Sequence, residues 1–486
     1  MLFNSAVFLF FFPVVFILYW FVFSRNVRLQ NIFIILSSYF FYGWWSWKLL
    51  LLLIAVTIIS YLSGSVLELF KDRNKQIWIL RFAVFINIGI LFLFKYYDFF
   101  VVNFVSAFHL FGINLDINPL YLILPIGISF YVFQALGYTI DVYNKKIHPS
   151  EDIISFFAFI SFFPQLLSGP IGRGSHLLPQ FSSKRNFIYT EAVDGLRQIL
   201  WGLFKKIVVA DNCAILVNGI FENYNTVPAS TLLFGAFFFT IQIYGDFSGY
   251  SDIAIGCAKL LGIQLGDNFK YPYFSRNIAE FWRRWHISLT TWFRDYIYIP
   301  LGGNRCSKAK VIRNTFIVFL VSGLWHGANW TFIIWGLYHA MFFLPLLLLN
   351  KKHKFQSVVA DNSLFPSCYE FLQMLLTFIL VMFGWVIFRS NTISQAYGYI
   401  SNLLFYKTLF VVPVFPGIPI DILFLIVLCS AILFMFVQEW LNRKGKHGLD
   451  LQVTSQWRRL LLYMCILMFI SYYSSSVPAS FIYFQF

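Results

Sequence analysis

Long apolar runs, separated by short polar or basic segments, recur along the whole chain. Most have about the 17–25 residues that a helix needs to cross the hydrocarbon core of a bilayer. The sequence therefore predicts an all-α, polytopic membrane protein with about 11–12 membrane segments, several of them half-length. The predicted spans include Leu2–Phe23, Ile32–Trp47, Leu49–Leu69, Ile77–Phe94, Leu120–Ile140, Ser230–Leu261, Phe371–Phe388, Ile422–Trp440 and Leu460–Tyr473.

Three segments depart from this regular pattern. The run Ile153–Ile171 ends in SFFPQLLSGPI, whose proline and glycine residues would break a helix that faces lipid. We expect a re-entrant segment here, with a loose cytoplasmic loop as the alternative. The run Val311–Leu349 predicts a helical hairpin with its turn at HGAN, where Gly327 supplies the tight backbone. The nearly uncharged stretch Asp98–Pro119 predicts an outer loop.

The composition agrees with a membrane protein and excludes a soluble multi-domain enzyme. The chain is 59% hydrophobic and 12% charged, whereas soluble domains hold about 25% charged residues. The net charge of +15 is explained by the excess of Lys and Arg in cytoplasmic loops and by contact with anionic lipid headgroups, not by nucleic acid. The first apolar run lacks a cleavage site, and Arg25 and Arg28 follow it. We expect a retained span with the N-terminus outside.

Residues 1–486 are expected to form one membrane domain, with a core at residues 100–350 and C-terminal spans and a tail at residues 351–486. The six cysteines are scattered and form no CxxC pair, so neither a disulfide framework nor a metal site is predicted.

The candidate chemistry centres on His326, in the apolar and aromatic stretch SGLWHGANWTFIIWGLYHA. An ionisable side chain at bilayer depth is a functional-site hypothesis by default, and a packed histidine bonded to a carbonyl is the alternative. A second histidine, His286, lies in the basic segment FWRRWHISLTTWFRDYIYIPLGGNR. The sequence has no HExxH, Walker or GxSxG motif. A neutral imidazole acting as a general base on a hydroxyl, in acyl transfer from a thioester, fits these residues.

Further candidates surround these histidines. Arg283, Arg284 and Arg294 could bind the phosphates of a donor, although anchoring in the lipid headgroups explains each equally well. Trp325, Asn329 and Trp330 could shape the pocket around His326, or simply pack. Asp246, in the motif YGDFSGYSD, is either a site or tunnel residue or a carboxylate bonded to a neighbouring helix.

These motifs together resemble the membrane-bound O-acyltransferase family. The similarity rests on WHGANWTFIIWGLYHA and FWRRWHISLTTWFRDYIYIPLGGNR, with SFFPQLLSGPI, KKIVVADN, YGDFSGYSD and the terminal FIYFQF, in this order. The branch it resembles most contains the membrane subunit of bacterial alginate O-acetyltransferase. The resemblance implies a ring of tilted and re-entrant helices around a central funnel and tunnel. It also implies that His326 is the catalytic base and that His286 lines the donor entry.

For such a protein the resemblance implies a location in the bacterial inner membrane and an acetyl donor in the cytoplasm, acetyl-CoA, with no tightly bound cofactor. It also implies an outer-face partner of the SGNH-hydrolase-like type and a polysaccharide acceptor. The tail FIYFQF would then lie outside, where Tyr483 could act as a transient acyl carrier activated by His326; a hydrophobic anchor is the alternative. Other open alternatives are transfer of D-alanine or a longer acyl group, and a lipid-linked saccharide transporter.

Overall fold

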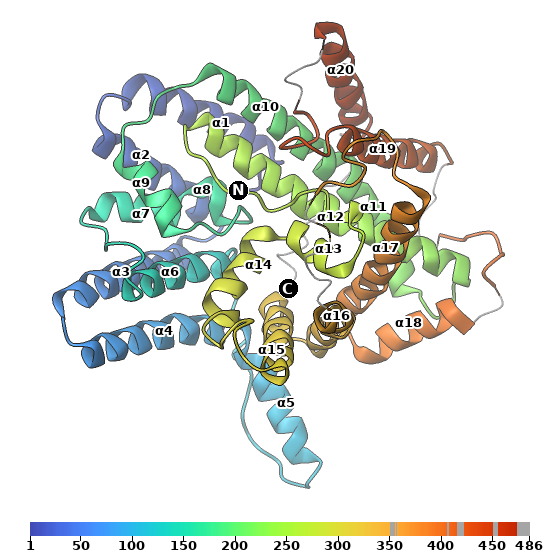
Figure 1. The fold of residues 1–486 in the computed structure, drawn as a ribbon, viewed down its shortest axis with the longest axis horizontal. Coiled ribbons are helices and arrows are strands. Elements are labelled where there is room, and N and C mark those ends of the chain that lie inside the picture. Colours follow the sequence, from blue (N-terminus) through green and yellow to red (C-terminus); the bar gives the residue numbers. More distant parts are fainter. Residues whose placement is uncertain (350–354, 356, 406–407, 416–421, 451–454, 474–486) are drawn as a thin grey trace. The chain divides into compact units, whose positions relative to one another are not determined.

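The computed structural model describes residues 1–349, 355, 357–405, 408–415, 422–450 and 455–473 (Figure 1). Every regular element among these residues is a helix, which confirms the all-α prediction. The chain divides into two compact units, Met1–Gly195 with Ala254–Gly266, and Leu196–Ile253 with Asp267–Phe486. The single domain over residues 1–486 and the central funnel stay predictions. Tyr483 lies outside the described residues.

The first unit is built around three long helices, α3, α4 and α6, which pack against one another (Figure 1). They are apolar along most of their length, and their buried positions include small or polar residues such as Ser60, Gly64 and Asn87. The helices of this unit are α1 (Ala6–Ile17), η1 (Leu18–Val22), α2 (Val27–Gly43), α3 (Trp47–Leu69), α4 (Arg73–Lys95), α5 (Tyr97–His109), α6 (Ile128–Tyr143), α7 (Ile153–Ser161), α8 (Phe163–Leu166) and α9 (Gly174–Ser182). The chain leaves the unit within α10 (Tyr189–Leu203).

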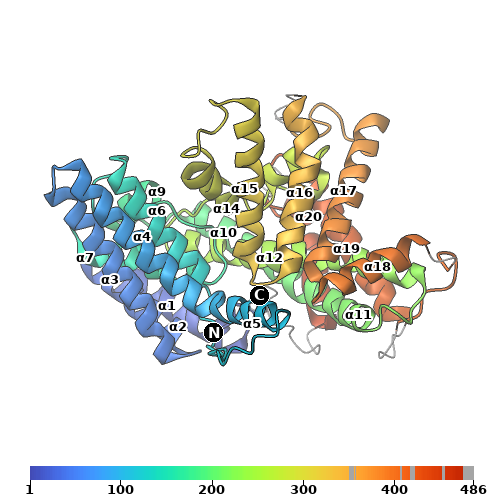
Figure 2. The same cartoon turned by 90° about the horizontal axis from the view of Figure 1, so that it is seen from below.

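The second unit contains the stretch around His326. Its helices α15, α16 and α17 stand side by side in chain order (Figure 2). The helices are η2 (Phe204–Ala210), α11 (Asp211–Glu222), α12 (Ala229–Leu260, which ends in the first unit), η3 (Pro272–Phe274), α13 (Ile278–Arg284), α14 (Ile287–Phe293), η4 (Arg294–Tyr298), α15 (Lys308–His326), α16 (Trp330–Leu348), α17 (Cys368–Arg389), α18 (Ile393–Phe405), α19 (Ile422–Leu441) and α20 (Gln456–Tyr473).

Five of the described helices are long and apolar enough to cross a membrane: α3, α4, α16, α17 and α19. The other predicted spans are shorter or less uniformly apolar in the structure. The prediction of an outer loop at Asp98–Pro119 was wrong in part, because this stretch contains most of α5. The predicted span from Leu120 was also wrong at its start, since α6 begins only at Ile128, after Gly127 in a left-handed conformation (φ 74°).

The broken segment after Ile153 is buried inside the first unit. Helix α7 ends at Ser161, and the short helix α8 follows after Phe162. All residues from 158 to 171 are buried, so the loose-loop alternative is wrong. The amide of Gln165 donates to Gln134 Oε1 at 2.7 Å. The irregular backbone therefore lies within the protein, as such segments require.

The predicted hairpin is confirmed, with α15 ending at His326 and α16 beginning at Trp330. The reason given for Gly327 was wrong. Its φ of −176° is ordinary extended backbone. Glycine is required here because there is no room for a side chain: a Cβ at Gly327 would lie 2.3 Å from the ring of Phe332.

Two further glycines let α15 and α16 approach closely. A Cβ at Gly323 would lie 2.3 Å from the carbonyl oxygen of Phe332, and a Cβ at Gly336 would lie 2.4 Å from that of Phe319. Small residues at such contacts are typical of closely packed helices in membranes. The backbone contact between these helices fixes the place of His326 at the end of α15.

Candidate active site

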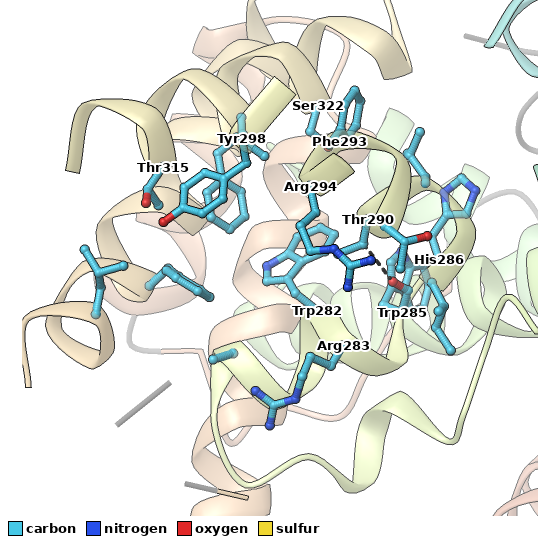
Figure 3. A pocket seen from close by; sticks show the side chains of 18 of the residues that line it. Trp282, Arg283, Trp285, His286, Thr290, Phe293, Arg294, Tyr298, Thr315 and Ser322 are labelled. Carbon is cyan, nitrogen blue, oxygen red and sulfur yellow. Dashed lines mark hydrogen bonds between the residues drawn. The ribbon is translucent and has the colours of Figure 1, made fainter. Parts of the chain in front are cut away.

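A cavity of about 470 Å³ lies within the second unit, lined by residues of α13, α14, η4, α15 and α16 (Figure 3). Its walls are mostly apolar, with Leu289, Phe293, Phe319, Phe343 and Leu347 among them. Ligand pockets commonly combine such walls with a few placed polar groups. The polar groups of this cavity include two histidines and two arginines.

His326 is one of the lining residues, and it comes from the C-terminal end of α15. Its side chain is only 3% exposed. Its imidazole lies edge-to-face against three aromatic rings, with centroid distances of 5.0 Å to Trp325, 5.0 Å to Trp335 and 5.2 Å to Phe388. These rings hold the imidazole in one place at the cavity.

Helix α15 contributes a whole stripe to the cavity wall. Thr315, Phe319, Ser322 and His326 all line it, at helical spacings of four, three and four residues. At about 1.5 Å per residue, this stripe extends roughly 16 Å along the helix. Sequence analysis missed Thr315, Phe319 and Ser322, although the periodicity counted back from His326 would have found them.

His286 lines the same cavity, from the turn between α13 and α14. Its ring packs 4.6 Å from the ring of Phe247 and 5.5 Å from that of Trp325, measured between centroids. Trp325 therefore contacts both histidines. Burial lowers the pKa of His286 to about 3, so its imidazole is neutral near pH 7. Both of its ring nitrogens are enclosed by protein.

The three candidate arginines divide into two groups. Arg283 and Arg294 line the cavity, and both are visible beside Trp282 in Figure 3. Arg283 also donates to the carbonyl oxygen of Phe355 at 2.6 Å. Arg284 is not among the lining residues; its guanidinium donates to Glu280 at 2.8 Å.

Arg276, which sequence analysis did not single out, holds the same carboxylate. It pairs with Glu280 at 3.0 Å and with Glu370 at 3.1 Å. Arg276 and Arg284 therefore stabilise the base of α13 around Glu280, while Arg283 and Arg294 remain at the cavity. Among the described residues, no group of three His, Cys, Asp or Glu side chains is placed to hold a metal ion.

A family model, described as the membrane-bound O-acyltransferase family, matches residues 40–351, which include both histidines and the whole cavity. The chain belongs to the membrane-bound O-acyltransferase family. It is an O-acyltransferase and a multi-pass membrane protein, and the resemblance seen in its motifs is confirmed.

Three relatives show what this O-acyltransferase is similar to. A probable alginate O-acetylase of Pseudomonas syringae pv. tomato is 40% identical over 82% of this chain and 74% of the relative. A peptidoglycan O-acetyltransferase of Helicobacter pylori is 34% identical over 82% of this chain and 78% of the relative. A teichoic acid D-alanyltransferase of Bacillus subtilis is 29% identical over 56% of this chain and 70% of the relative.

In this O-acyltransferase the other pocket candidates lie behind or beside the cavity lining. Trp325 is buried against the two histidines. Asn329 is the N-cap of α16, where its side chain accepts from the amide of Thr331 at 3.1 Å. Its amide also donates to the carbonyl oxygen of Asn391 at 2.9 Å. Trp330 is 48% exposed. None of the three is among the lining residues.

Asp246 lies apart from the lining residues of this O-acyltransferase, in an ion pair between helices. Its carboxylate is 2.7 Å from the Nζ atom of Lys206, which is also 2.7 Å from Asp211. Next to it, Lys205 pairs with Asp252 at 2.5 Å. The interpretation of Asp246 as a carboxylate bonded to a neighbouring helix therefore describes its position.

The motifs KKIVVADN and YGDFSGYSD, which sequence analysis treated separately, thus bind each other. Glycines allow this contact: a Cβ at Gly249 would lie 2.8 Å from the carbonyl oxygen of Gly202, and a Cβ at Gly245 would lie 3.1 Å from that of Lys205. The GxxxG spacing of Gly245 and Gly249 was a signal for this packing in the sequence.

Proposed function

We propose that this O-acyltransferase takes an acetyl group from cytoplasmic acetyl-CoA and passes it across the inner membrane for O-acetylation of a polysaccharide. The observation that carries the proposal is that His326 and His286 line one apolar cavity together with Arg283 and Arg294. The two most similar relatives named above are, by name, an alginate O-acetylase and a peptidoglycan O-acetyltransferase. Their names support the class of acceptor.

In the proposed reaction His326 acts as the general base. Its imidazole accepts the proton of the acceptor hydroxyl while the hydroxyl oxygen attacks the carbonyl carbon of the thioester. The C–O bond forms, the C–S bond breaks, and the imidazolium returns the proton to the leaving thiolate. The aromatic rings of Trp325, Trp335 and Phe388 fix the orientation of the imidazole for both proton transfers.

Arg283 and Arg294 are proposed to bind the phosphates of the donor at the cavity. Guanidinium groups bind phosphate through paired, charge-assisted hydrogen bonds. The stripe of α15 from Thr315 to His326 then gives the donor a path of roughly 16 Å towards the base. Arg284 has no part in this proposal, because it pairs with Glu280 outside the lining residues.

The charge of the cavity favours acetyl over D-alanyl as the group transferred. A D-alanyl group carries an ammonium, which is costly to bury without a partner of opposite charge. The described lining residues include no Asp or Glu, and the carboxylate of the neighbouring Asp295 is paired with the guanidinium of Arg294 at 2.8 Å. A neutral acetyl group does not meet this difficulty. D-alanyl transfer remains the second candidate only because a teichoic acid D-alanyltransferase is among the relatives.

On the outer face, the proposal includes an SGNH-hydrolase-like partner that completes transfer to the polysaccharide. Tyr483 is proposed as a transient acyl carrier between His326 and that partner: its phenol oxygen takes the acetyl group as the thiol leaves, and then gives it up to the next hydroxyl. Replacing Tyr483 with Phe removes the oxygen and keeps the ring. Polymer acetylation at the wild-type level in that variant would refute the carrier role.

The proposal is tested by replacing His326 with Ala and measuring polymer O-acetylation in cells at equal amounts of membrane protein. We expect acetylation to fall by at least about a hundredfold, which is the usual contribution of a general base. His109→Ala is the matched control, since His109 is exposed on α5 and should leave acetylation unchanged. Full acetylation with His326→Ala would refute the proposed base.

A further inference from the structure

The turn that carries His286 has an unfavourable backbone conformation and lacks the usual cap. His286 is the N-cap residue of α14, with φ 42° and ψ 56°, in the left-handed region that residues with a side chain rarely adopt. Its side chain makes no capping hydrogen bond. N-cap positions are normally occupied by Ser, Thr, Asp or Asn, whose side chains accept from the first free amides of the helix. Another group must therefore hold this turn.

Asn268, from the segment before α13, supplies that support. Its backbone carbonyl oxygen accepts from the amide of Ile287 at 2.9 Å. Its side-chain Oδ1 accepts from the hydroxyl of Ser288 at 2.6 Å, and its Nδ2 donates to the hydroxyl of Ser251 on α12 at 2.8 Å. Asn268 is only 1% exposed, so these bonds are shielded from water. One buried residue thus ties the start of α14 to α12.

We propose that Asn268 is a positioning residue that holds His286 at the cavity. Because Asn268 binds the first two residues of α14, the imidazole of His286 is not needed as a cap. It packs instead between Phe247 and Trp325 and contributes to the cavity wall. Ser251, at the other end of the link, belongs to the YGDFSGYSD motif, which gives this part of the motif a role at the site. The part of the proposal that concerns activity rests on the proposed function.

The kinetic test compares Asn268→Ala, His286→Ala and the double variant, using detergent-solubilised enzyme with acetyl-CoA. We expect Asn268→Ala to change the same kinetic parameter as His286→Ala does, either by lowering kcat or by raising KM. The loss should be roughly tenfold to a hundredfold, as for a displaced active-site group. The double variant should be no worse than His286→Ala alone. Additive losses, or normal activity in either single variant, would overturn the proposal.

Asn212→Ala is the matched control for the loss of a buried amide. Asn212 is fully buried, and its amide donates to the carbonyl oxygens of Ile207 and Val208, away from the cavity lining. We expect this variant to lose thermal stability and to keep its kcat and KM. If Asn212→Ala changed the same parameter as strongly as Asn268→Ala, the effect would be one of general stability and the proposal would be overturned.

A second measurement does not depend on activity. Glycine adopts the left-handed conformation without strain, so His286→Gly should reduce the need for an external support. We expect Asn268→Ala to lower the melting temperature less in the His286→Gly background than in the wild type. Equal shifts in both backgrounds would show that Asn268 does not hold this turn. If the wild type transfers no acetyl group, the proposed function fails, and the melting temperatures still decide whether Asn268 holds His286.

Discussion

The ammonium of Lys206 lies 2.7 Å from the carboxylate of Asp246, and both side chains are almost completely buried. This pair joins the π-helical segment η2 to α12, and Asp211 contributes a second carboxylate to the same ammonium. Removing one member of a buried ion pair leaves a charge without compensation, which costs about 3–5 kcal/mol. The pair is therefore expected to matter for stability first.

Lys206→Met should destabilise the protein more than Asp246→Asn. The first change leaves two buried carboxylates without their cation and should cost about 3–5 kcal/mol, whereas the second leaves Lys206 paired with Asp211. Thermal unfolding in detergent measures the stability of both variants. The kcat of the folded Asp246→Asn protein should be that of the wild type. A loss of donor affinity at unchanged stability would instead support the interpretation of Asp246 as a site or tunnel residue.

Gly336→Ala should disturb the hairpin that holds His326. The added Cβ would lie 2.4 Å from the carbonyl oxygen of Phe319, so α15 and α16 must separate. We expect a loss of stability of about 1–3 kcal/mol, as for other overpacked sites, with reduced acetyl transfer. Gly89→Ala on α4 is the control, because nothing lies within 4 Å of the new Cβ there. Equal melting temperatures for the two variants would contradict the close-packing explanation.

Arg294→Gln and Arg283→Gln should each raise the KM for acetyl-CoA by roughly tenfold to a hundredfold, which corresponds to the loss of a charge-assisted hydrogen bond. Arg284→Gln is the control, because its guanidinium binds Glu280 away from the lining residues. That variant should lose stability and keep its KM. Steady-state kinetics with detergent-solubilised enzyme distinguishes the three. An unchanged KM in both cavity variants would refute phosphate binding by these residues.

His286 should make stability depend on pH in the acid range. Burial lowers its pKa to about 3 from the ordinary 6.5. Between these values the unfolded chain binds a proton that the folded protein excludes, so stability falls as the pH drops below 6.5 and is unaffected by His286 above it. At about pH 5 the loss is at most about 2 kcal/mol.

His286→Asn removes this titration and keeps a residue that tolerates the left-handed conformation. Melting temperatures measured between about pH 7.5 and pH 5 should therefore decline less in this variant than in the wild type. An identical decline in both proteins would show that His286 is not a buried neutral imidazole in solution.

Much of the fold followed from local patterns. The apolar runs predicted the helices. Proline, glycine and polar residues that interrupt the apolar sequence predicted the helix break at SFFPQLLSGPI and the hairpin turn at HGAN. The errors arose where local apolarity was ambiguous. Residues Tyr97–His109 were assigned mostly to an outer loop because the stretch from Asp98 carries few charges. In the structure they form α5. The next span was predicted to begin at Leu120, but its helix, α6, begins only after Gly127.

The order of apolar runs and motifs along the chain was enough to predict a helical membrane protein with His326 and His286 as the candidates for its chemistry. Which polar residues meet across helices became known from the packed structure. It placed both histidines with Arg283 and Arg294 on one cavity, paired Asp246 with Lys206, and brought Asn268 to the start of α14. Hydrophobic periodicity indicates only on which face of its own helix a residue lies. The partner of a buried charge or amide depends instead on which helices pack together, and here that depends on glycine contacts between segments far apart in the chain.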